Sequence, residues 1–245
     1  MAQKYSLKPK ASVSEGDVNL SPQRAAWSAA HIDASTQDLL AQDAQYFLHQ
    51  SLSSPCLNVL THSNGIYLED TQGRQIMDFH GNSVHQVGYG HPKVVDAIKK
   101  QLDTLPFCPR RYTNQTAIDL ARRLAELAPG QLNKMLFAPG GTNAIGMALK
   151  LARYATGRHK TISMWESFHG ASLDAISIGG ESLFRKEVGP LLPGCEHIPP
   201  PTRGKCHFNC QDEQHEGCLN YLKYVIEMEG DIGALIAEPM RWTSV

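Results

Sequence analysis

Apolar residues recur at intervals of three and four positions in several stretches of the chain, which predicts amphipathic helices. These stretches cover residues 33–50, the segment that begins at Pro92, Thr116 to Leu127, and Ala144 to Tyr154. Pro92 favours the first position of a helix, because an N–H group has no partner there in any case. The sequence therefore predicts four helices in these positions.

Short apolar runs bounded by glycine turns predict two kinds of β structure. Three runs between residues 57 and 79 flank Asn64-Gly65 and Gly73, which predicts a small antiparallel meander. Later runs alternate with helical segments, as in a parallel sheet covered by helices. These later runs are Lys134–Ala138, Thr161–Trp165 and Ile232–Ala237.

These patterns divide the chain into three parts. Residues 1–56 form an N-terminal arm and helix, 57–114 contain the meander, and 115–245 form an α/β region with a mainly parallel sheet. Residues 1–30 are polar and show little periodicity, so they are predicted to be an extended arm or a poorly ordered terminus.

Composition narrows the class of protein. The chain has 245 residues, 23 Lys plus Arg, 24 Asp plus Glu, and 42% hydrophobic residues, as in an ordinary globular protein. The near-neutral charge argues against a nucleic-acid binder, which needs a basic surface. We find no apolar run of membrane-spanning length and no secretory signal, so we expect a cytoplasmic protein whose six cysteines are reduced.

A glycine turn, Pro139-Gly140-Gly141-Thr142, connects a predicted strand to a predicted helix. Free N–H groups at the start of a helix bind anions, and glycines let the backbone approach closely. The turn is therefore a candidate phosphate site, and its alternative is a glycine turn without a ligand. It matches neither the dinucleotide nor the nucleoside-triphosphate motif.

Two further clusters follow predicted strands. Phe168-His169-Gly170 comes after the strand that ends at Trp165, and Glu238-Pro239 ends the last one. An aromatic ring there can stack on a planar heterocycle, although Phe168 as a core residue is the simpler interpretation. A phosphate cradle, an aromatic side chain and an acid together predict a site for a phosphorylated aromatic cofactor.

Five motifs in order resemble the class III, fold-type I aminotransferases, which use pyridoxal 5′-phosphate (PLP). They are the Gly65–Phe79 meander, Val87–Val94, the Ala138–Arg153 turn and helix, Phe168-His169-Gly170, and Ile236–Pro239. The resemblance implies an α/β fold in which 57–114 begin the small domain and 115–245 are an incomplete large domain. It also implies a homodimer with sites at the subunit interface.

The resemblance assigns roles to matching positions. Gly141 and Thr142 would hold the cofactor phosphate through backbone N–H groups, with Gly140 shaping the turn. The family's usual Ser-Gly-Ser-Glu-Ala is replaced here by Pro139-Gly140-Gly141-Thr142-Asn143. The lost Glu puts substrate handling in question and is compatible with phosphate binding.

The same resemblance implies that Phe168 stacks on the pyridine ring, that His169 sits beside it, and that Glu238 forms a hydrogen bond near the ring. The segment around Tyr46–His49 and the proline- and cysteine-rich region resemble a branch that acts as 1-hydroxy-2-aminoethylphosphonate ammonia-lyase. The sequence leaves transaminase and ammonia-lyase chemistry open.

Arg110 and Arg111 are candidate binding residues for a substrate phosphonate or carboxylate. Such a group is a natural ligand for a guanidinium, which offers several N–H donors. A solvated basic pair is the alternative interpretation of either residue.

A PLP enzyme needs a lysine that forms a Schiff base. In the family this lysine follows the Glu-Pro strand, whereas this sequence stops at Val245. Lys134, Lys150 and Lys160 lie at the wrong ends of their elements, and nothing matches Lys205 to the family lysine. We therefore expect the front part of a longer enzyme, inactive alone. The alternative is a non-catalytic relative that binds PLP or a partner chain without turnover.

Cys206, Cys210 and Cys218, with His207 and His215 between them, are the residue types that bind zinc. Their spacing is not the paired CxxC of structural zinc sites, so a reduced loop near solvent is the preferred interpretation. The sequence alone assigns no metal ligand here, and a zinc-binding interaction module is the third hypothesis for the protein.

Overall fold

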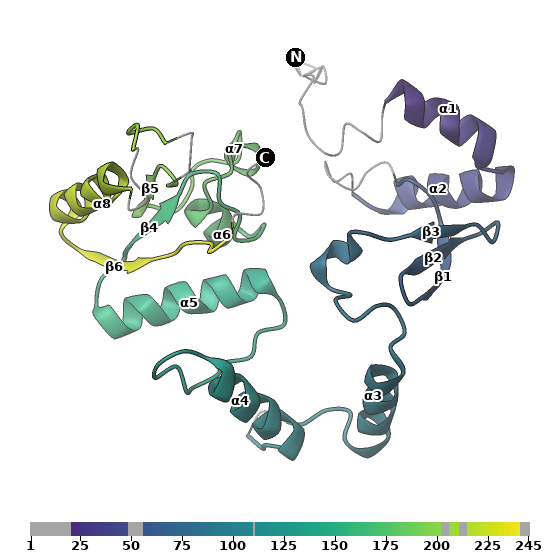
Figure 1. Cartoon of the computed structure of the whole chain (residues 1–245), viewed down its shortest axis with the longest axis horizontal. Coiled ribbons are helices and arrows are strands. Elements are labelled where there is room, and N and C mark those ends of the chain that lie inside the picture. Colours follow the sequence, from purple (N-terminus) through teal and green to yellow (C-terminus); the bar gives the residue numbers. More distant parts are fainter. Residues whose placement is uncertain (1–20, 49–55, 110, 202–205, 211–214, 241–245) are drawn as a thin grey trace, which may run out of the picture. The chain divides into compact units, whose positions relative to one another are not determined.

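The computed structural model describes residues 21–48, 56–109, 111–201, 206–210 and 215–240. The chain divides into two compact units, Met1–Ala117 and Ile118–Val245. Each unit has a three-stranded sheet, antiparallel in the first and parallel in the second (Figure 1). The residues predicted to hold a cofactor all lie in the second unit.

The first unit begins with helices α1 (Pro22–His31) and α2 (Ala34–Tyr46). A side-chain oxygen caps each helix: Ser21 accepts the N–H of Arg24 at 3.1 Å, and Asp33 accepts the N–H of Thr36 at 2.8 Å. These caps satisfy N–H groups that have no partner inside the helix. The helix predicted over 33–50 is confirmed as far as Tyr46.

The prediction of an extended arm or a poorly ordered terminus is wrong for residues 22–30, which belong to the helix Pro22–His31. Ser21 followed by Pro22 is a helix start, and the rings of Trp27 and His31, one turn apart, stack with centroids 4.9 Å apart. These local contacts stabilise a helix that apolar periodicity does not predict. Residues 1–20 of the predicted arm lie outside the described residues.

The antiparallel meander is confirmed as strands β1 (Leu60–Asn64), β2 (Tyr67–Asp70) and β3 (Gln75–Met77). Gly65, in the turn between β1 and β2, has a φ of +58°, which glycine adopts without the steric cost of a Cβ atom. Its backbone also pairs with Tyr89 through hydrogen bonds of 2.9 and 2.7 Å. The Val87–Val94 motif therefore begins beside the meander.

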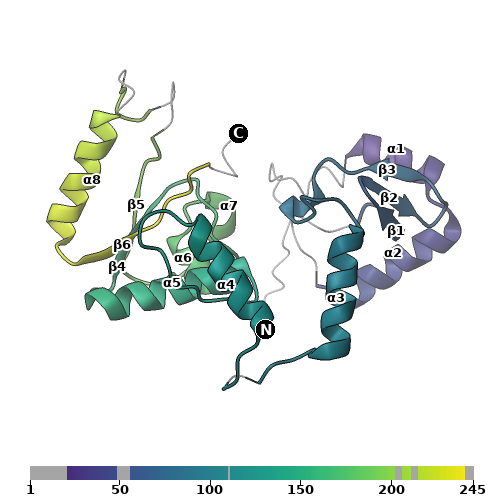
Figure 2. The ribbon, with the colours of Figure 1, turned by 60° about the horizontal axis from the view of Figure 1, so that its bottom comes forward.

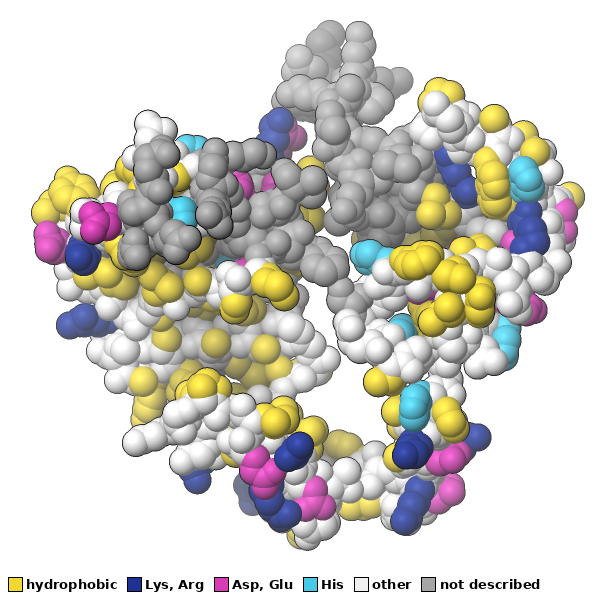
Figure 3. Space-filling view, viewed as in Figure 1, with side chains coloured by type: hydrophobic (Ala, Val, Ile, Leu, Met, Phe, Trp, Pro, Cys, Tyr) yellow, Lys and Arg dark blue, Asp and Glu magenta, His cyan; other side chains and the backbone are white. Residues whose placement is uncertain are grey.

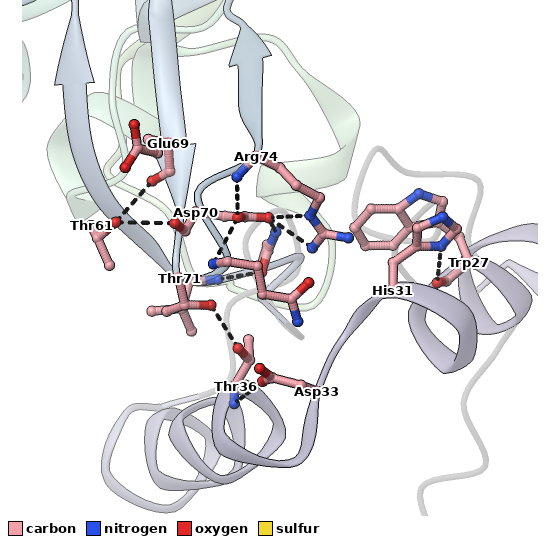
Figure 4. A network of polar contacts seen from close by, with 12 residues as sticks. Trp27, His31, Asp33, Thr36, Thr61, Glu69, Asp70, Thr71 and Arg74 are labelled. Atoms are coloured by element: carbon pink, nitrogen blue, oxygen red, sulfur yellow. Dashed lines mark hydrogen bonds and ion pairs between the residues drawn. The ribbon is translucent and has the colours of Figure 1, made fainter.

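A buried carboxylate closes the turn between β2 and β3 (Figure 4). Asp70 accepts hydrogen bonds from Asn58 and from the backbone of Gln72 and Arg74, and it forms an ion pair of 2.7 Å with the Arg74 guanidinium. Next to it, the hydroxyls of Thr71 and Thr36 lie 2.6 Å apart and join the turn to α2. Asp70 therefore organises the amino-terminal sheet.

After a short 3-10 helix (η2, Gly81–Ser83), the predicted helices appear as α3 (Pro92–Thr104) and α4 (Gln115–Leu127). The apolar face predicted for α3 is exposed: Val94 is 46%, Ile98 55% and Leu102 58% accessible. Apolar side chains also remain on the surface elsewhere (Figure 3). No helix in the described part of the chain has the length and apolar character to cross a membrane.

The second unit is built on parallel strands β4 (Lys160–Met164), β5 (Cys195–Ile198) and β6 (Ile232–Leu235), in the order β5-β4-β6. Its apolar core is Ile162, Ala175, Ile178, Ile198 and Cys218. The long helix α5 (Gly141–Thr156) runs alongside this sheet and contacts β6 (Figure 2). The parallel α/β arrangement predicted from the sequence is confirmed.

Some elements of this unit differ from the prediction. Lys134–Ala138 is not a strand, because no strand of the described residues pairs with it, and Leu136 is 72% exposed. Sequence patterning missed four elements, which are β5, α6 (Leu173–Ile178), α7 (Ser182–Arg185) and α8 (Glu216–Glu229). α6 and α7 each span fewer than two turns, too short for a clear helical period.

Candidate cofactor site

The site begins at the amino end of α5. Gly140 precedes the helix in an extended conformation, and no side chain caps the first turn. Gly140 and Gly141 are exposed, and Thr142 is half-buried. The N–H groups of this turn are therefore accessible and carry the partial positive charge of the helix dipole. An anion such as a phosphate fits this cradle.

Gly170 brings the second motif to this cradle. Its φ is +125°, and a Cβ atom added there would lie 3.1 Å from the Thr142 Cα, closer than real Cβ atoms ordinarily come. Only glycine allows this approach without strain. The loop that carries Phe168 and His169 is therefore packed against the first turn of α5.

Glu238 joins the third motif to the same loop. One carboxylate oxygen, Oε1, accepts the backbone N–H of Phe168 at 2.7 Å and lies 3.9 Å from Nδ1 of His169. These contacts connect segments that follow β4 and β6 and lie 70 residues apart in sequence. The structure thus brings Phe168, His169 and Glu238 into direct contact, and Gly170 packs their loop against Thr142 in the first turn of α5.

The side chain of His169 is buried, with 5% of it accessible. Its Nε2 lies 3.4 Å from the hydroxyl of Ser163, which is itself 3.3 Å from the hydroxyl of Ser167. Burial lowers the pKa of His169, because desolvation disfavours the charged ring, and the nearby Glu238 carboxylate opposes this shift. The neutral imidazole is therefore favoured.

Phe168 is half-buried, and its ring packs at a tilt of 45° against Phe184, with centroids 4.7 Å apart. This contact and the hydrogen bond from its backbone N–H to Glu238 fix the residue from two sides. Stacking of Phe168 on a cofactor ring stays a prediction.

Ser167 is a site residue that sequence analysis missed. Its hydroxyl donates to the carbonyl of Met164 at 2.6 Å, and its two oxygens accept the N–H of Gly180 at 2.9 and 3.1 Å. A Cβ atom at Gly180 would collide with the backbone of Met164. The Gly179-Gly180 pair in the sequence could have indicated this contact with Ser167, since adjacent glycines outside a helix mark a close backbone approach.

The remaining predicted residues lie elsewhere. Arg111 is exposed in the first unit, and Arg110 lies outside the described residues. Lys160 starts β4, where its ammonium is 2.6 Å from Glu229 and 2.9 Å from Asp231. Hydrogen bonds from Lys160 to these carboxylates raise its pKa to about 12. As predicted, this lysine sits at the amino end of its strand, away from the motifs that follow the strand.

The cysteine stretch forms a second cluster, at the start of α8. Ligand atoms of Cys206, Cys210, His215 and Cys218 lie within 4.8 Å of one another. His207 is not a member of this group. The structure therefore gathers residues that the preferred sequence interpretation left in an open loop.

The chain belongs to the class-III aminotransferase family, whose model matches residues 49–242. The recognition made from the five motifs is confirmed. The cofactor that this membership implies is pyridoxal 5′-phosphate, and the exposed, uncapped turn at Gly140–Thr142 fits its phosphate group.

Among curated relatives, the chain is 51% identical to (R)-1-hydroxy-2-aminoethylphosphonate ammonia-lyase of Vibrio splendidus, over 95% of this chain and 52% of the relative. It is 38% identical to acetylornithine aminotransferase of Methanopyrus kandleri, over 74% of this chain and 42% of that protein. The chain thus spans about half the length of these relatives.

Solved structures of transaminases share the fold. An (S)-enantioselective omega-transaminase from Thermomicrobium roseum matches with a TM-score of 0.76 and 29% identity, over 84% of this chain and 50% of that one. An amine transaminase from an uncultivated Pseudomonas species, solved in its PLP-bound form, matches with a TM-score of 0.67 and 30% identity, over 75% of this chain and 44% of that one.

Proposed function

We propose that the protein at its native length is a PLP-dependent enzyme that releases ammonia from a small amino-phosphonate. The observation that carries this proposal is the 51% identity to the phosphonate ammonia-lyase across 95% of the chain. The acetylornithine aminotransferase match is weaker, at 38% over 74% of the chain. Transamination of a small amine or amino acid is the alternative reaction.

The residues of the second unit supply binding and orientation. The backbone N–H groups of Gly141 and Thr142 would hold the cofactor phosphate, with Gly140 leaving the approach open. Glu238 fixes the backbone of Phe168 and lies next to the buried His169. When bound, PLP draws electrons from the substrate carbon that carries the amine, as both reactions require.

A substrate phosphonate needs a cationic partner, and Arg111 is our proposal for it, with Arg110 as its neighbour in sequence. An exposed guanidinium can contact two oxygens of one phosphonate group at once. A phosphonate carries more negative charge than a carboxylate at neutral pH. Replacing Arg111 by Gln would therefore weaken phosphonate binding more than the binding of an amine that carries no anionic group.

The first test separates the two reactions. Protein of native length is incubated with (R)-1-hydroxy-2-aminoethylphosphonate in the absence of any keto acid, and free ammonia is measured. A lyase releases ammonia under these conditions, whereas a transaminase leaves the amine on the cofactor after a single turnover. Formation of alanine only when pyruvate is added would favour the transaminase.

The second test examines cofactor binding separately from turnover. Borohydride reduction followed by intact-mass measurement detects a covalent pyridoxyl adduct. An adduct without turnover of either substrate would favour the non-catalytic relative. No adduct and no PLP binding at native length would contradict the proposal.

We extend the proposal to a homodimer, as the family resemblance implies. Apolar side chains such as Ile98 and Leu102 on α3 are exposed, which supports the proposal that a second subunit covers them. Light scattering of the native-length protein should give twice the mass of one chain. A monomer mass at micromolar concentration would contradict this extension.

A further inference from the structure

A cluster of sulfur and nitrogen ligands lies at the start of α8 and contains none of the residues assigned to the cofactor. Cys206 and Cys210 come from the segment that precedes the helix, His215 is its N-cap, and Cys218 is in its first turn. The spacing is C-x3-C-x4-H-x2-C. Cys218 is buried and the other three residues are half-buried.

The dimensions of the cluster match one tetrahedral metal ion. The Cys218 sulfur lies 3.2 Å from that of Cys206 and 3.9 Å from that of Cys210, and all four ligand atoms fall within 4.8 Å of one another. Four ligands around zinc, with Zn–S bonds of about 2.3 Å, place sulfurs about 3.8 Å apart. A single ion can therefore contact all four residues with small side-chain adjustments.

His215 provides independent evidence of a ligand. Its Nδ1 is buried and has no hydrogen-bond partner among the described residues. Leaving a buried polar nitrogen unsatisfied costs free energy, so such an atom calls for an explanation. The residue also has a φ of +51°, a left-handed conformation that is uncommon outside glycine. With this backbone conformation, the His215 imidazole at the start of α8 lies next to the three cysteine sulfurs.

The surrounding backbone is shaped around the sulfurs. The N–H of Phe208 donates to the Cys206 sulfur at 3.4 Å, and the N–H of Asn209 donates to the Cys206 carbonyl at 3.0 Å in a tight turn. A Cβ atom at Gly217 would lie 3.0 Å from the Cys210 sulfur. Gly217 thus lets the first turn of the helix approach the cysteine segment.

We propose that Cys206, Cys210, His215 and Cys218 bind one zinc ion in a closed structural site. Three thiolates and one imidazole form a set that zinc prefers in four-coordinate structural sites. Because the protein supplies all four ligands, the ion has no open position for a substrate or an activated water. Metal binding displaces the thiol protons into solvent, and no electron is transferred.

The site fastens the segment before α8 to that helix. α8 leads through Gly230 to β6, and the chain after β6 carries Glu238. The zinc ion therefore stabilises the part of the second unit that delivers Glu238 to the cofactor loop. The ion contributes its binding free energy to the stability of the folded state, as in other structural zinc sites.

The test is metal content of the native-length protein, purified after expression with added zinc and dialysed against metal-free buffer. We expect about one zinc ion per chain, the number that four protein ligands bind. Replacement by Co²⁺ should give the visible bands of tetrahedral cobalt and sulfur-to-cobalt charge transfer. The cobalt spectrum needs no variant, so it decides the proposal even if substitutions prevent folding.

Matched variants locate the ligands. H215A and C210S should lose most of the zinc, whereas H207A and C195S should keep it. His207 is the histidine outside the cluster, and Cys195 is a half-buried cysteine on β5 of the same unit. Zinc content is measured with and without PLP, so a failure of the proposed enzyme activity does not affect the result.

Three results would overturn the proposal. The first is wild-type protein with no zinc and no tetrahedral cobalt spectrum. The second is equal loss of zinc in H207A and H215A. The third is an intact mass two hydrogens below the reduced mass, with a peptide map that joins Cys206 to Cys218, which would identify a disulfide in place of a metal site.

Discussion

Two carboxylates organise the two units in different ways. In the first unit, Asp70 is 1% exposed, and all its donors lie between Asn58 and Arg74. In the second unit, Glu238 keeps 15% of its side chain exposed and holds Phe168, 70 residues earlier. One carboxylate closes a local turn, and the other connects distant segments at an accessible edge.

The difference separates a stabilising role from a site-forming role. Asp70 is surrounded by donors and has no room for a ligand, so its removal should affect folding of the first unit. Glu238 holds the loop beside the uncapped start of α5, so its removal should affect cofactor binding more than folding. Substitution of Asp70 should therefore lower stability more than PLP affinity, and substitution of Glu238 should lower PLP affinity more than stability.

The largest effect is expected for Asp70→Ala. It leaves the Arg74 guanidinium and the N–H groups of the turn without their acceptor, which costs about 2–3 kcal/mol with allowance for the partly exposed arginine. Hydrogen exchange of peptides covering residues 58–77 should show the loss. Asp119→Ala, at an exposed pair with Arg122, should cost about 0.5 kcal/mol or less. Equal effects of the two substitutions would contradict the role of Asp70.

A pH dependence follows from the same carboxylate. Burial alone would raise the pKa of Asp70, but hydrogen bonds from Arg74, Asn58 and Gln72 outweigh it and hold the pKa to about 2. The unfolded value is about 3.9, so the lowered pKa stabilises the fold above that pH. This stabilisation should fall as the pH drops from about 4 to about 2.

The pH measurement needs the Asp70→Asn variant. Asp33 and Asp78 also have pKa values of about 2, lowered chiefly by the Thr36 N–H and the Tyr89 hydroxyl respectively. They titrate in the same window. The difference between wild type and Asp70→Asn in urea midpoints from pH 5 to pH 2.5 isolates Asp70. Parallel curves for the two proteins would exclude its contribution.

Local features of this chain were predictable, and long-range pairings were not. The Asn64-Gly65 turn and the helix at Pro92 depend on neighbouring residues, and both are confirmed. Lys134–Ala138 has the composition of a strand, yet strand formation needs a partner strand that composition does not specify. The missed helix Pro22–His31 had a visible start at Ser21, but Trp27 is its only bulky apolar residue.

The candidate site shows the same limit. The motifs predicted Gly141, Phe168 and Glu238 in one site, because parallel strands bring their carboxyl ends together. This argument holds for Phe168 after β4 and Glu238 after β6, whereas Gly141 follows a segment that is not a strand. The contacts within it, such as the Gly170 backbone against Thr142, depend on packing at atomic distance and were not predictable from spacing. The proposed zinc ligands were named but left unassigned, because their spacing is not the paired CxxC of structural zinc sites and did not show that α8 begins at Glu216.

A smaller effect, confined to the cofactor, is expected for Gly170→Ala. The methyl group would meet Thr142 at a φ of +125°, and such strain costs about 1–3 kcal/mol. If the strain displaces the turn at the start of α5, PLP affinity should fall about 10-fold to 100-fold. Gly189→Ala is the control, since Gly189 is exposed, lies outside the candidate site and has no atom within 4 Å of an added Cβ atom. Titration of each native-length variant with PLP measures the difference, and equal affinities would refute the role of Gly170.

The smallest effect is expected at Glu238, and it distinguishes shape from charge. Glu238→Ala removes the acceptor of the Phe168 N–H, which should weaken PLP binding about 10-fold. The free energy of unfolding should fall by less than in Asp70→Ala, because this substitution removes the acceptor of one backbone N–H where Asp70→Ala removes several hydrogen bonds. Glu238→Gln keeps a carbonyl oxygen at that position and should retain most of the affinity.

Glu238→Gln also removes a negative charge that lies 3.9 Å from His169. In the wild-type protein this charge raises the pKa of the imidazole, so the pKa of His169 should fall further in the variant. An NMR titration of His169 in Glu238→Gln measures this shift directly. If Gln weakens PLP binding as much as Ala does, the charge of Glu238 holds the site together, and the hydrogen bond to Phe168 is secondary.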